Sequence, residues 1–263
     1  MIHWCVEALL LVLLFACKPP VTAPEDLDGL LNFMYVHMAD EEDEALLIGM
    51  DNVFAFVDSN KEALEEGYDI SPLSIPTIEA IGQSTAFREQ TYGVSIAYDV
   101  PHPVEDIAEC YAAVNLIEIY PDTYLSYERE FLTDQSCFLN QECNFVQYRS
   151  IIQTALPLNA TVTTNNMVEI RWFQTNRGLA FVQRSWMEGE AESSADWANL
   201  LAQNYLEISW STTSGTQSLA ASWAALQLGD IPVPEDTAKN LALGSIRDSR
   251  EALTLYLDEQ TAQ

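Results

Sequence analysis

Residues 226–234 read LQLGDIPVP and lead from the last strand-like stretch of the chain into its last helical stretch. Pro232 and Pro234 stand just before Glu235 and Asp236, an order typical of a helix N-terminus. Small and apolar residues then recur every three or four positions, at Ala238, Leu241, Ala242, Ser245, Ser249, Ala252, Leu253 and Tyr256. This period predicts a long C-terminal helix with one buried face.

Six strand-like stretches precede this passage, and each is rich in β-branched or aromatic residues and bounded by turn formers. They lie near residues 123–132, 145–156, 161–173, 179–188, 204–212 and 216–227. Alternation is clearest at Val168, Ile170 and Trp172, and again at Leu206, Ile208 and Trp210. Ser214 and Gly215 supply a tight turn between the last two stretches, which predicts a hairpin.

Further toward the N-terminus, residues 91–100 alternate as a strand does, and a Pro-His-Pro break at residues 101–103 leads into a helix over 104–114. Two amphipathic helices are expected before it. Their stripes lie over residues 27–38 and 46–57, and Asp40 can cap the second helix. We therefore expect a helical hairpin, a connector with a short helix over residues 71–83, and then the strands.

The order of strand, helix, six antiparallel strands and long C-terminal helix resembles the helix-grip fold of the START and birch-pollen-allergen-like superfamily. The resemblance covers residues 90–260 and includes the passage LQLGDIPVP, which looks like the strand-to-helix passage of START-like domains. It implies an α+β fold in which residues 90–263 form the domain and residues 25–89 a helical extension. A different strand count would give another α+β or a lipocalin-like arrangement.

The resemblance also implies an apolar cavity for lipids or other hydrophobic molecules between the sheet and the C-terminal helix. Trp172, Trp186 and Trp210 lie on three predicted strands, and Arg184 shares the alternation phase of Trp186. If these residues line the cavity, Arg184 could bind a carboxylate or phosphate headgroup. Alternatively, the tryptophans are plain core and Arg184 faces solvent or pairs with a strand neighbour such as Glu207.

The composition is strongly acidic: the 263 residues carry a formal net charge of −29, with a pI near 4.1. Such a charge repels nucleic acid, and it also repels anionic lipid surfaces. With 48% hydrophobic residues, the chain is expected to be globular. Any attachment to a membrane therefore has to come from a covalent anchor.

The N-terminus supplies a candidate for such an anchor. Residues 8–17 read ALLLVLLFAC, an apolar run too short to span a bilayer but long enough for a signal peptide. Its end, Leu14 to Cys17, resembles the lipobox of bacterial lipoproteins, although Phe15 is bulky and no Lys or Arg precedes the run. The resemblance implies a signal peptide over residues 1–16, acylated Cys17 with a tether over 17–24, and a place in the cell envelope. By the same resemblance, the absence of aspartate at position 18, where Lys18 stands, permits sorting to the outer membrane of a Gram-negative cell. An ordinary signal peptide with a coincidental cysteine and a buried N-terminal helix are the alternatives.

No catalytic or metal-binding motif emerges from the sequence, so we expect neither an enzyme nor a bound metal or cofactor. His37 and His102 stand in no motif. If acylation consumes Cys17, three cysteines remain in an oxidising compartment. Cys137 and Cys143 enclose a short loop and are the expected disulfide, with Cys110 buried, while a bond from Cys110 to either is the alternative.

Two functional hypotheses follow. The first is a lipid-anchored, non-enzymatic protein that binds a hydrophobic small molecule or lipid. The second is a structural or protein-interaction lipoprotein of the cell envelope, which has no ligand cavity and uses its acidic surface or its N-terminal hairpin to bind a protein partner that the sequence does not identify.

Overall fold

The computed structural model describes residues 21–155, 160–197, 199–227, 229 and 235–262. The predicted signal peptide, Cys17, the first half of the tether and most of the passage before the C-terminal helix lie outside these residues. None of the described helices is both long and apolar enough to cross a bilayer.

Within the described residues, nine strands form one antiparallel sheet. They are β1 (Tyr68–Ile70), β2 (Thr91–Val100), β3 (Tyr124–Phe131), β4 (Phe145–Ala155), β5 (Thr161–Thr175), β6 (Gly178–Met187), β7 (Glu192–Ser193), β8 (Asn199–Thr212) and β9 (Gly215–Gln227). Their order across the sheet is β1-β2-β9-β8-β6-β5-β4-β3, and β7 pairs with β5. Every predicted strand is present. The sequence does not indicate β1 and β7, because three and two residues are too few to show alternation.

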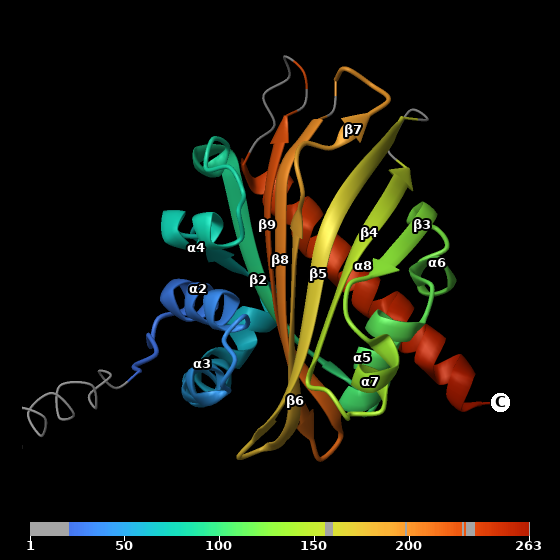
Figure 1. Ribbon diagram of the computed structural model, residues 1–263. Coiled ribbons are helices and arrows are strands. Elements are labelled where there is room, and N and C mark those ends of the chain that lie inside the picture. The colour runs from blue at the N-terminus through green and yellow to red at the C-terminus, as the bar shows by residue number, and fades with distance from the viewer. Residues whose placement is uncertain (1–20, 156–159, 198, 228, 230–234, 263) are drawn as a thin grey trace, which may run out of the picture.

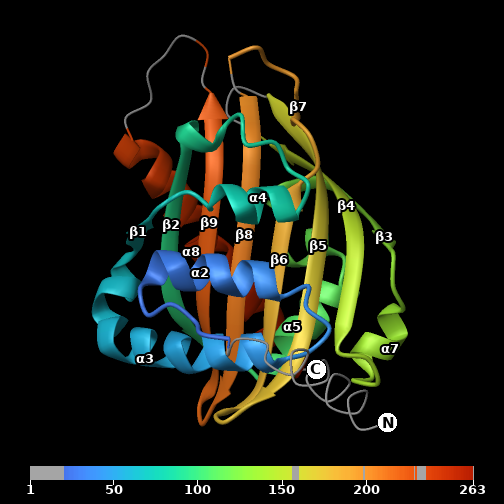
Figure 2. The ribbon, with the colours of Figure 1, turned by 60° about the vertical axis from the view of Figure 1, so that its left-hand side comes forward.

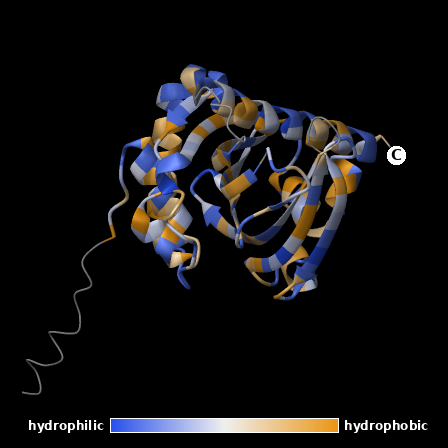
Figure 3. Ribbon diagram, turned by 90° about the horizontal axis from the view of Figure 1, so that it is seen from above, coloured by the Kyte–Doolittle hydropathy of each residue, from blue (hydrophilic) through white to orange (hydrophobic). Residues whose placement is uncertain are grey.

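Helices cover both faces of this sheet (Figures 1 and 2). They are α2 (Leu27–His37), α3 (Glu44–Glu66), α4 (Ile75–Ala80), the 3-10 turn η1 (Arg88–Gln90), α5 (Val104–Ala113), α6 (Leu116–Ile119), α7 (Gln135–Leu139) and α8 (Glu235–Thr261). We call the face under α2, α3 and α4 the outer face and the face toward α8 the inner face. Seen from above, the curved sheet separates the N-terminal helices from α8 (Figure 3).

The predicted α+β helix-grip arrangement is confirmed: an N-terminal helical hairpin is followed by an antiparallel sheet that wraps around a long C-terminal helix. The hairpin between β8 and β9 turns at Gly215, whose φ of +136° suits glycine. A Cβ atom there would also lie 2.3 Å from the carbonyl oxygen of Val100, so the turn requires glycine for space as well.

The N-terminal helices share one hydrophobic core with the outer face of the sheet. Leu30, Leu31 and Met34 of α2 are fully buried, and their cluster includes Leu206 and Ile208 of β8. The segment 25–89 also contributes β1, which pairs with β2. The segment expected to be an extension is therefore packed against the domain that follows it.

The predicted cap of the second helix is wrong. The helix begins after Asp43, not after Asp40, and the side chain of Asp43 makes no capping hydrogen bond. That carboxylate instead pairs with Arg171 of β5 at 2.6 Å, while the Asp40 carboxylate lies 2.6 Å from Nδ1 of His37. A nearby arginine thus competes successfully with the backbone amides for the carboxylate.

Candidate ligand-binding cavity

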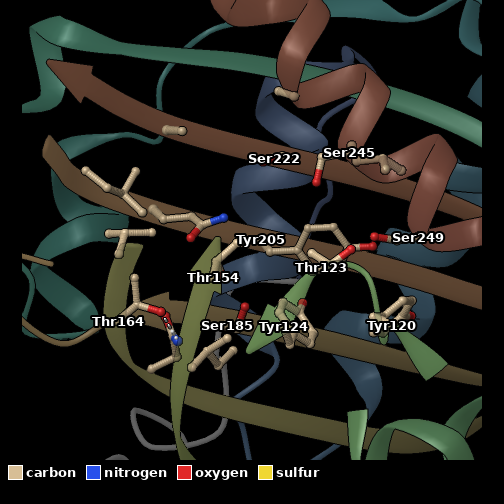
Figure 4. A pocket seen from close by; sticks show the side chains of 18 of the residues that line it. Tyr120, Thr123, Tyr124, Thr154, Thr164, Ser185, Tyr205, Ser222, Ser245 and Ser249 are labelled. Atoms are coloured by element: carbon tan, nitrogen blue, oxygen red, sulfur yellow. Dashed lines mark hydrogen bonds between the residues drawn. The ribbon is translucent and has the colours of Figure 1, made fainter. Parts of the chain in front are cut away.

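A cavity of about 460 Å³ lies between the inner face of the sheet and α8. Side chains from the sheet, from α8 and from the segment before β3 reach into it (Figure 4). Its size falls in the range of small-molecule sites, which begins at about 300 Å³.

The strands contribute to the wall through their period of two. On β6, for example, Gln183 and Ser185 face the cavity, while Val182 packs in the outer core. On α8 the cavity-facing residues are mostly small, and Ala238, Ala242, Ser245 and Ser249 are among them. Further along the helix, Leu253 and Leu257 are buried in the inner core. The cavity therefore lies along the part of α8 that carries these small residues, and Leu253 and Leu257 fill the space further along the helix.

The wall is aromatic and hydroxyl-rich as well as apolar. Seven tyrosines line it: Tyr92, Tyr111, Tyr120, Tyr124, Tyr127, Tyr148 and Tyr205. Apolar side chains such as Val94, Val168 and Ile246 lie between them. Such a mixture of apolar surface with a few placed polar groups is typical of sites for amphipathic small molecules.

A buried acid lies behind this wall. Glu207 of β8 is 1% exposed. The hydroxyls of Tyr111 and Tyr205 donate to its Oε2 at 3.0 and 2.9 Å, and Ser209 donates to its Oε1 at 2.9 Å. Burial raises the pKa of the Glu207 carboxyl, and hydrogen bonds from Tyr205, Ser209, Tyr111 and Tyr98 oppose this rise. Among the described residues Glu207 has no cationic partner, so hydroxyl groups alone solvate it.

Three polar atoms at the cavity wall are buried without a hydrogen-bond partner within the described part of the chain. They are the hydroxyl oxygens of Tyr127 and Ser150 and the amide oxygen Oε1 of Gln183. The side chains of Tyr127 and Ser150 lie near each other. Because buried polar groups are nearly always paired, these atoms indicate where a ligand can bind.

Lys239 is the one charged residue among the described residues that line the cavity. It lies near the N-terminal end of α8, and its Nζ is 2.7 Å from Oδ2 of Asp69. The described residues of the wall include no histidine, cysteine, aspartate or glutamate.

None of the four predicted ligand-binding residues lines this cavity. Arg184 and Trp186 share a face, as their alternation predicts, but it is the outer face, where Trp210 also packs under α2 and α3. Trp172 is on the inner face and stacks on Phe138 of α7, with Phe181 at its edge. Alternation shows that residues share a face, but it cannot show which face carries the cavity.

Arg184 anchors the N-terminal helices instead of a ligand. It is 4% exposed and pairs with Glu169 of β5 at 2.6 Å, so its partner is not Glu207. It also donates to the carbonyl oxygen of Tyr35 in α2. Arg171 of β5 similarly donates to the carbonyl oxygens of Met38 and Glu41, at 3.2 and 3.0 Å, just after α2.

The cysteines are arranged as expected, with Cys137 bonded to Cys143 and Cys110 free. Cys137 and Cys143 form a disulfide around the end of α7, and Cys110 is a buried free thiol on α5. Burial, with smaller contributions from Glu109 and Asp106, raises the pKa of the Cys110 thiol to about 12. Such a thiol is a poor nucleophile at neutral pH.

The two histidines of the described chain have structural contacts. Nε2 of His102 lies 2.9 Å from Oδ1 of Asp258, which joins the loop before α5 to the last turns of α8. No group of three or more histidine, cysteine or acidic side chains in the described residues could hold a metal ion.

From the sequence, Glu207 is expected only as a possible partner of Arg184, and the group that it forms with Tyr111, Tyr205 and Ser209 is not indicated. A signal is present in hindsight: Tyr205, Glu207 and Ser209 alternate with Leu206, Ile208 and Trp210, so one face of an otherwise apolar strand is polar. Tyr111 comes from α5, about a hundred positions away in the sequence, and no local period could associate it with Glu207.

No family model matches the sequence, and no curated protein is similar to it. A STAR-related lipid transfer protein of Xanthomonas axonopodis is similar in structure at 10% identity, with a TM-score of 0.44 over 64% of this chain and 85% of that one. Human STARD10 is similar at 9% identity, with a TM-score of 0.40 over 66% of each chain. The lipid transfer and protein localization domain of human StarD13 is similar at 12% identity, with a TM-score of 0.37 over 77% of this chain and 93% of that one.

Proposed function

We propose that this protein is a non-enzymatic binding protein that holds a hydrophobic small molecule or lipid between its sheet and α8. The observation that carries the proposal is the cavity of about 460 Å³, whose wall combines apolar side chains, tyrosine rings and unpartnered buried polar atoms. Because a well-packed core has few voids larger than a water molecule, an opening of this size needs a functional reason.

Binding is a better interpretation of this wall than catalysis. Catalytic sites place a nucleophile, base or acid in contact with the reacting atoms. The described lining residues offer hydroxyls, amides and Lys239 but no imidazole, thiol or carboxylate. The second hypothesis, a structural lipoprotein without a ligand cavity, does not account for this space.

We also propose that the protein is held in the cell envelope by a lipid on Cys17, which lies outside the described residues. Support comes from the lipobox-like sequence and from the net charge of −29, which opposes other modes of attachment to anionic membranes. Expression of the full chain in a Gram-negative host with labelled palmitate tests this. The wild type should take up label in the envelope fraction and C17S should not; equal labelling of both would contradict the anchor.

A cavity-filling variant tests the binding function. Ala224 of β9 lines the cavity, so A224F should occupy the space that a ligand needs. We expect A224F to weaken binding of the neutral fluorophore N-phenyl-1-naphthylamine by about tenfold or more, since overlap with a filled pocket costs more than about 1.4 kcal/mol. The matched control is A55F, at an exposed position on α3 beyond the opposite face of the sheet. Binding that is undetectable in the wild type, or equal in both variants, would contradict the proposal.

A further inference from the structure

Tyr111 and Tyr205 line the cavity, but the protons of their hydroxyls are used in hydrogen bonds to a residue behind the wall. Each hydroxyl has a single proton, and each donates it to Oε2 of Glu207. Because Oε2 of Glu207 accepts both of these hydrogen bonds, it orients the hydroxyl protons of both tyrosines away from the cavity. The two tyrosine oxygens still have lone pairs, so they can accept hydrogen bonds from a ligand.

A further acceptor lies next to them. Gln183 of β6 is directly opposite Glu207 of β8 in the strand register, and Ser185 is opposite Tyr205. Ser185 and Tyr205 are both labelled in Figure 4. Oε1 of Gln183 is buried and has no partner among the described residues; this oxygen accepts hydrogen bonds, and Nε2 of the same amide donates them. The oxygens of Tyr111, Tyr205 and Gln183 thus form one patch of acceptors.

The charges around this patch oppose an anionic group. Glu207 lies directly behind it, and no arginine is among the described lining residues. Lys239 is on α8, where it pairs with Asp69 of β1, away from Glu207 on the central strand β8. A carboxylate or phosphate at the patch would meet these acceptor oxygens and the buried acid behind them, which oppose its negative charge.

We infer that the patch formed by Tyr111, Tyr205 and Gln183 recognises a hydrogen-bond donor, so that the ligand is a neutral amphipathic molecule with a hydroxyl or N–H group and not a fatty acid or phospholipid. This rests on the proposed function, because it names the class of molecule that the same cavity holds. It also replaces Arg184 as the source of headgroup specificity, since Arg184 lies on the other face of the sheet.

Three probes with the same twelve-carbon chain test the inference: dodecan-1-ol, dodecyl methyl ether and dodecanoate. The alcohol has a donor, the ether is neutral without a donor, and the carboxylate is an anion. Their affinities are measured by displacement of N-phenyl-1-naphthylamine from the purified protein at pH 7.5. We expect the alcohol to bind at least about fivefold more tightly than the ether and about tenfold more tightly than dodecanoate.

Variants then locate the effect. Q183L removes one acceptor and should reduce the preference for alcohol over ether to about twofold or less. Q203L makes the same change at an exposed glutamine of the cavity wall and should leave the preference unchanged. E207Q exchanges the buried carboxylate for an amide, which donates to one tyrosine and so releases that tyrosine's proton; its discrimination against dodecanoate should fall.

The outcomes separate this inference from the function on which it rests. If all three probes displace the fluorophore equally, or dodecanoate binds best, the donor preference is wrong while the binding function stands. If none displaces it and the fluorophore itself does not bind, both are wrong. If Q203L removes the preference and Q183L does not, the acceptor patch is misplaced.

Discussion

At the scale of single residues, Glu207 has an unusual environment. An isolated charge in a protein interior is costly unless a counter-ion or several hydrogen bonds compensate it. Here hydroxyls from β2, α5 and β8 replace the counter-ion, with Tyr98, Tyr111 and Tyr205 among them. The side chain thereby joins three elements that enclose the cavity, and it also determines how two tyrosines face a ligand.

The raised pKa of Glu207 predicts how its contribution to stability depends on pH. The folded protein keeps this proton to a higher pH than the unfolded chain, so unfolding releases a proton above the ordinary glutamate pKa of about 4.3. The free energy of unfolding of the wild type therefore loses this contribution as pH rises from about 4.3 through the raised pKa. E207Q cannot titrate, so its stability relative to the wild type should improve over that range.

Urea unfolding of both proteins at several pH values from about 4.5 to 8 measures this difference. The exposed variant E192Q serves as the control for the loss of one acidic group from a strongly acidic protein. A difference between E207Q and the wild type that stays the same across the range, once the control is subtracted, would contradict the assignment.

At the scale of elements, two buried arginines of the sheet attach the N-terminal hairpin. The last carbonyl groups of a helix lack partners within the helix. Arg184 binds the carbonyl oxygen of Tyr35 near the end of α2, and Arg171 binds those of Met38 and Glu41. The hairpin is thus held by hydrogen bonds from β5 and β6 as well as by its hydrophobic core with the outer face.

Removal of Arg184 should destabilise the fold strongly. R184M leaves Glu169 buried without its cation and the Tyr35 carbonyl without this donor, which should cost about 3–5 kcal/mol of unfolding free energy. The matched control is R177M. Arg177 also joins the sheet to α3, through Asp58 at 2.6 Å, but both side chains are about half exposed, so its loss should cost under about 1 kcal/mol. Equal losses in the two variants would show that Arg184 does not anchor the hairpin.

At the scale of the whole molecule, the sheet is buried on both faces, and this explains what the sequence could and could not predict. The stripes of α2, α3 and α8 and the seven longer strands are predictable, because each period is local. Which face carries the cavity is a tertiary property. Since Trp210 and Trp172 both follow apolar alternation yet pack on opposite faces, alternation alone could not assign either to a ligand.

The candidate site is therefore less predictable than the fold. The small residues on the α8 stripe, such as Ala242 and Ser245, are visible in the sequence, and in the structure they leave room beside the sheet. The tyrosines around Glu207 come from β2, α5 and β8, and only the fold brings them together.

The central claim is that the space between the sheet and α8 holds a hydrophobic ligand, and a crystal structure with 12-bromododecan-1-ol tests it most directly. The anomalous signal of bromine marks the end of the chain without any assumption about its path. We predict one strong bromine peak inside the cavity, with the hydroxyl within hydrogen-bond distance of Gln183, Tyr111 or Tyr205. Bromine peaks confined to the outer face or to the surface, with the cavity unchanged, would contradict the account.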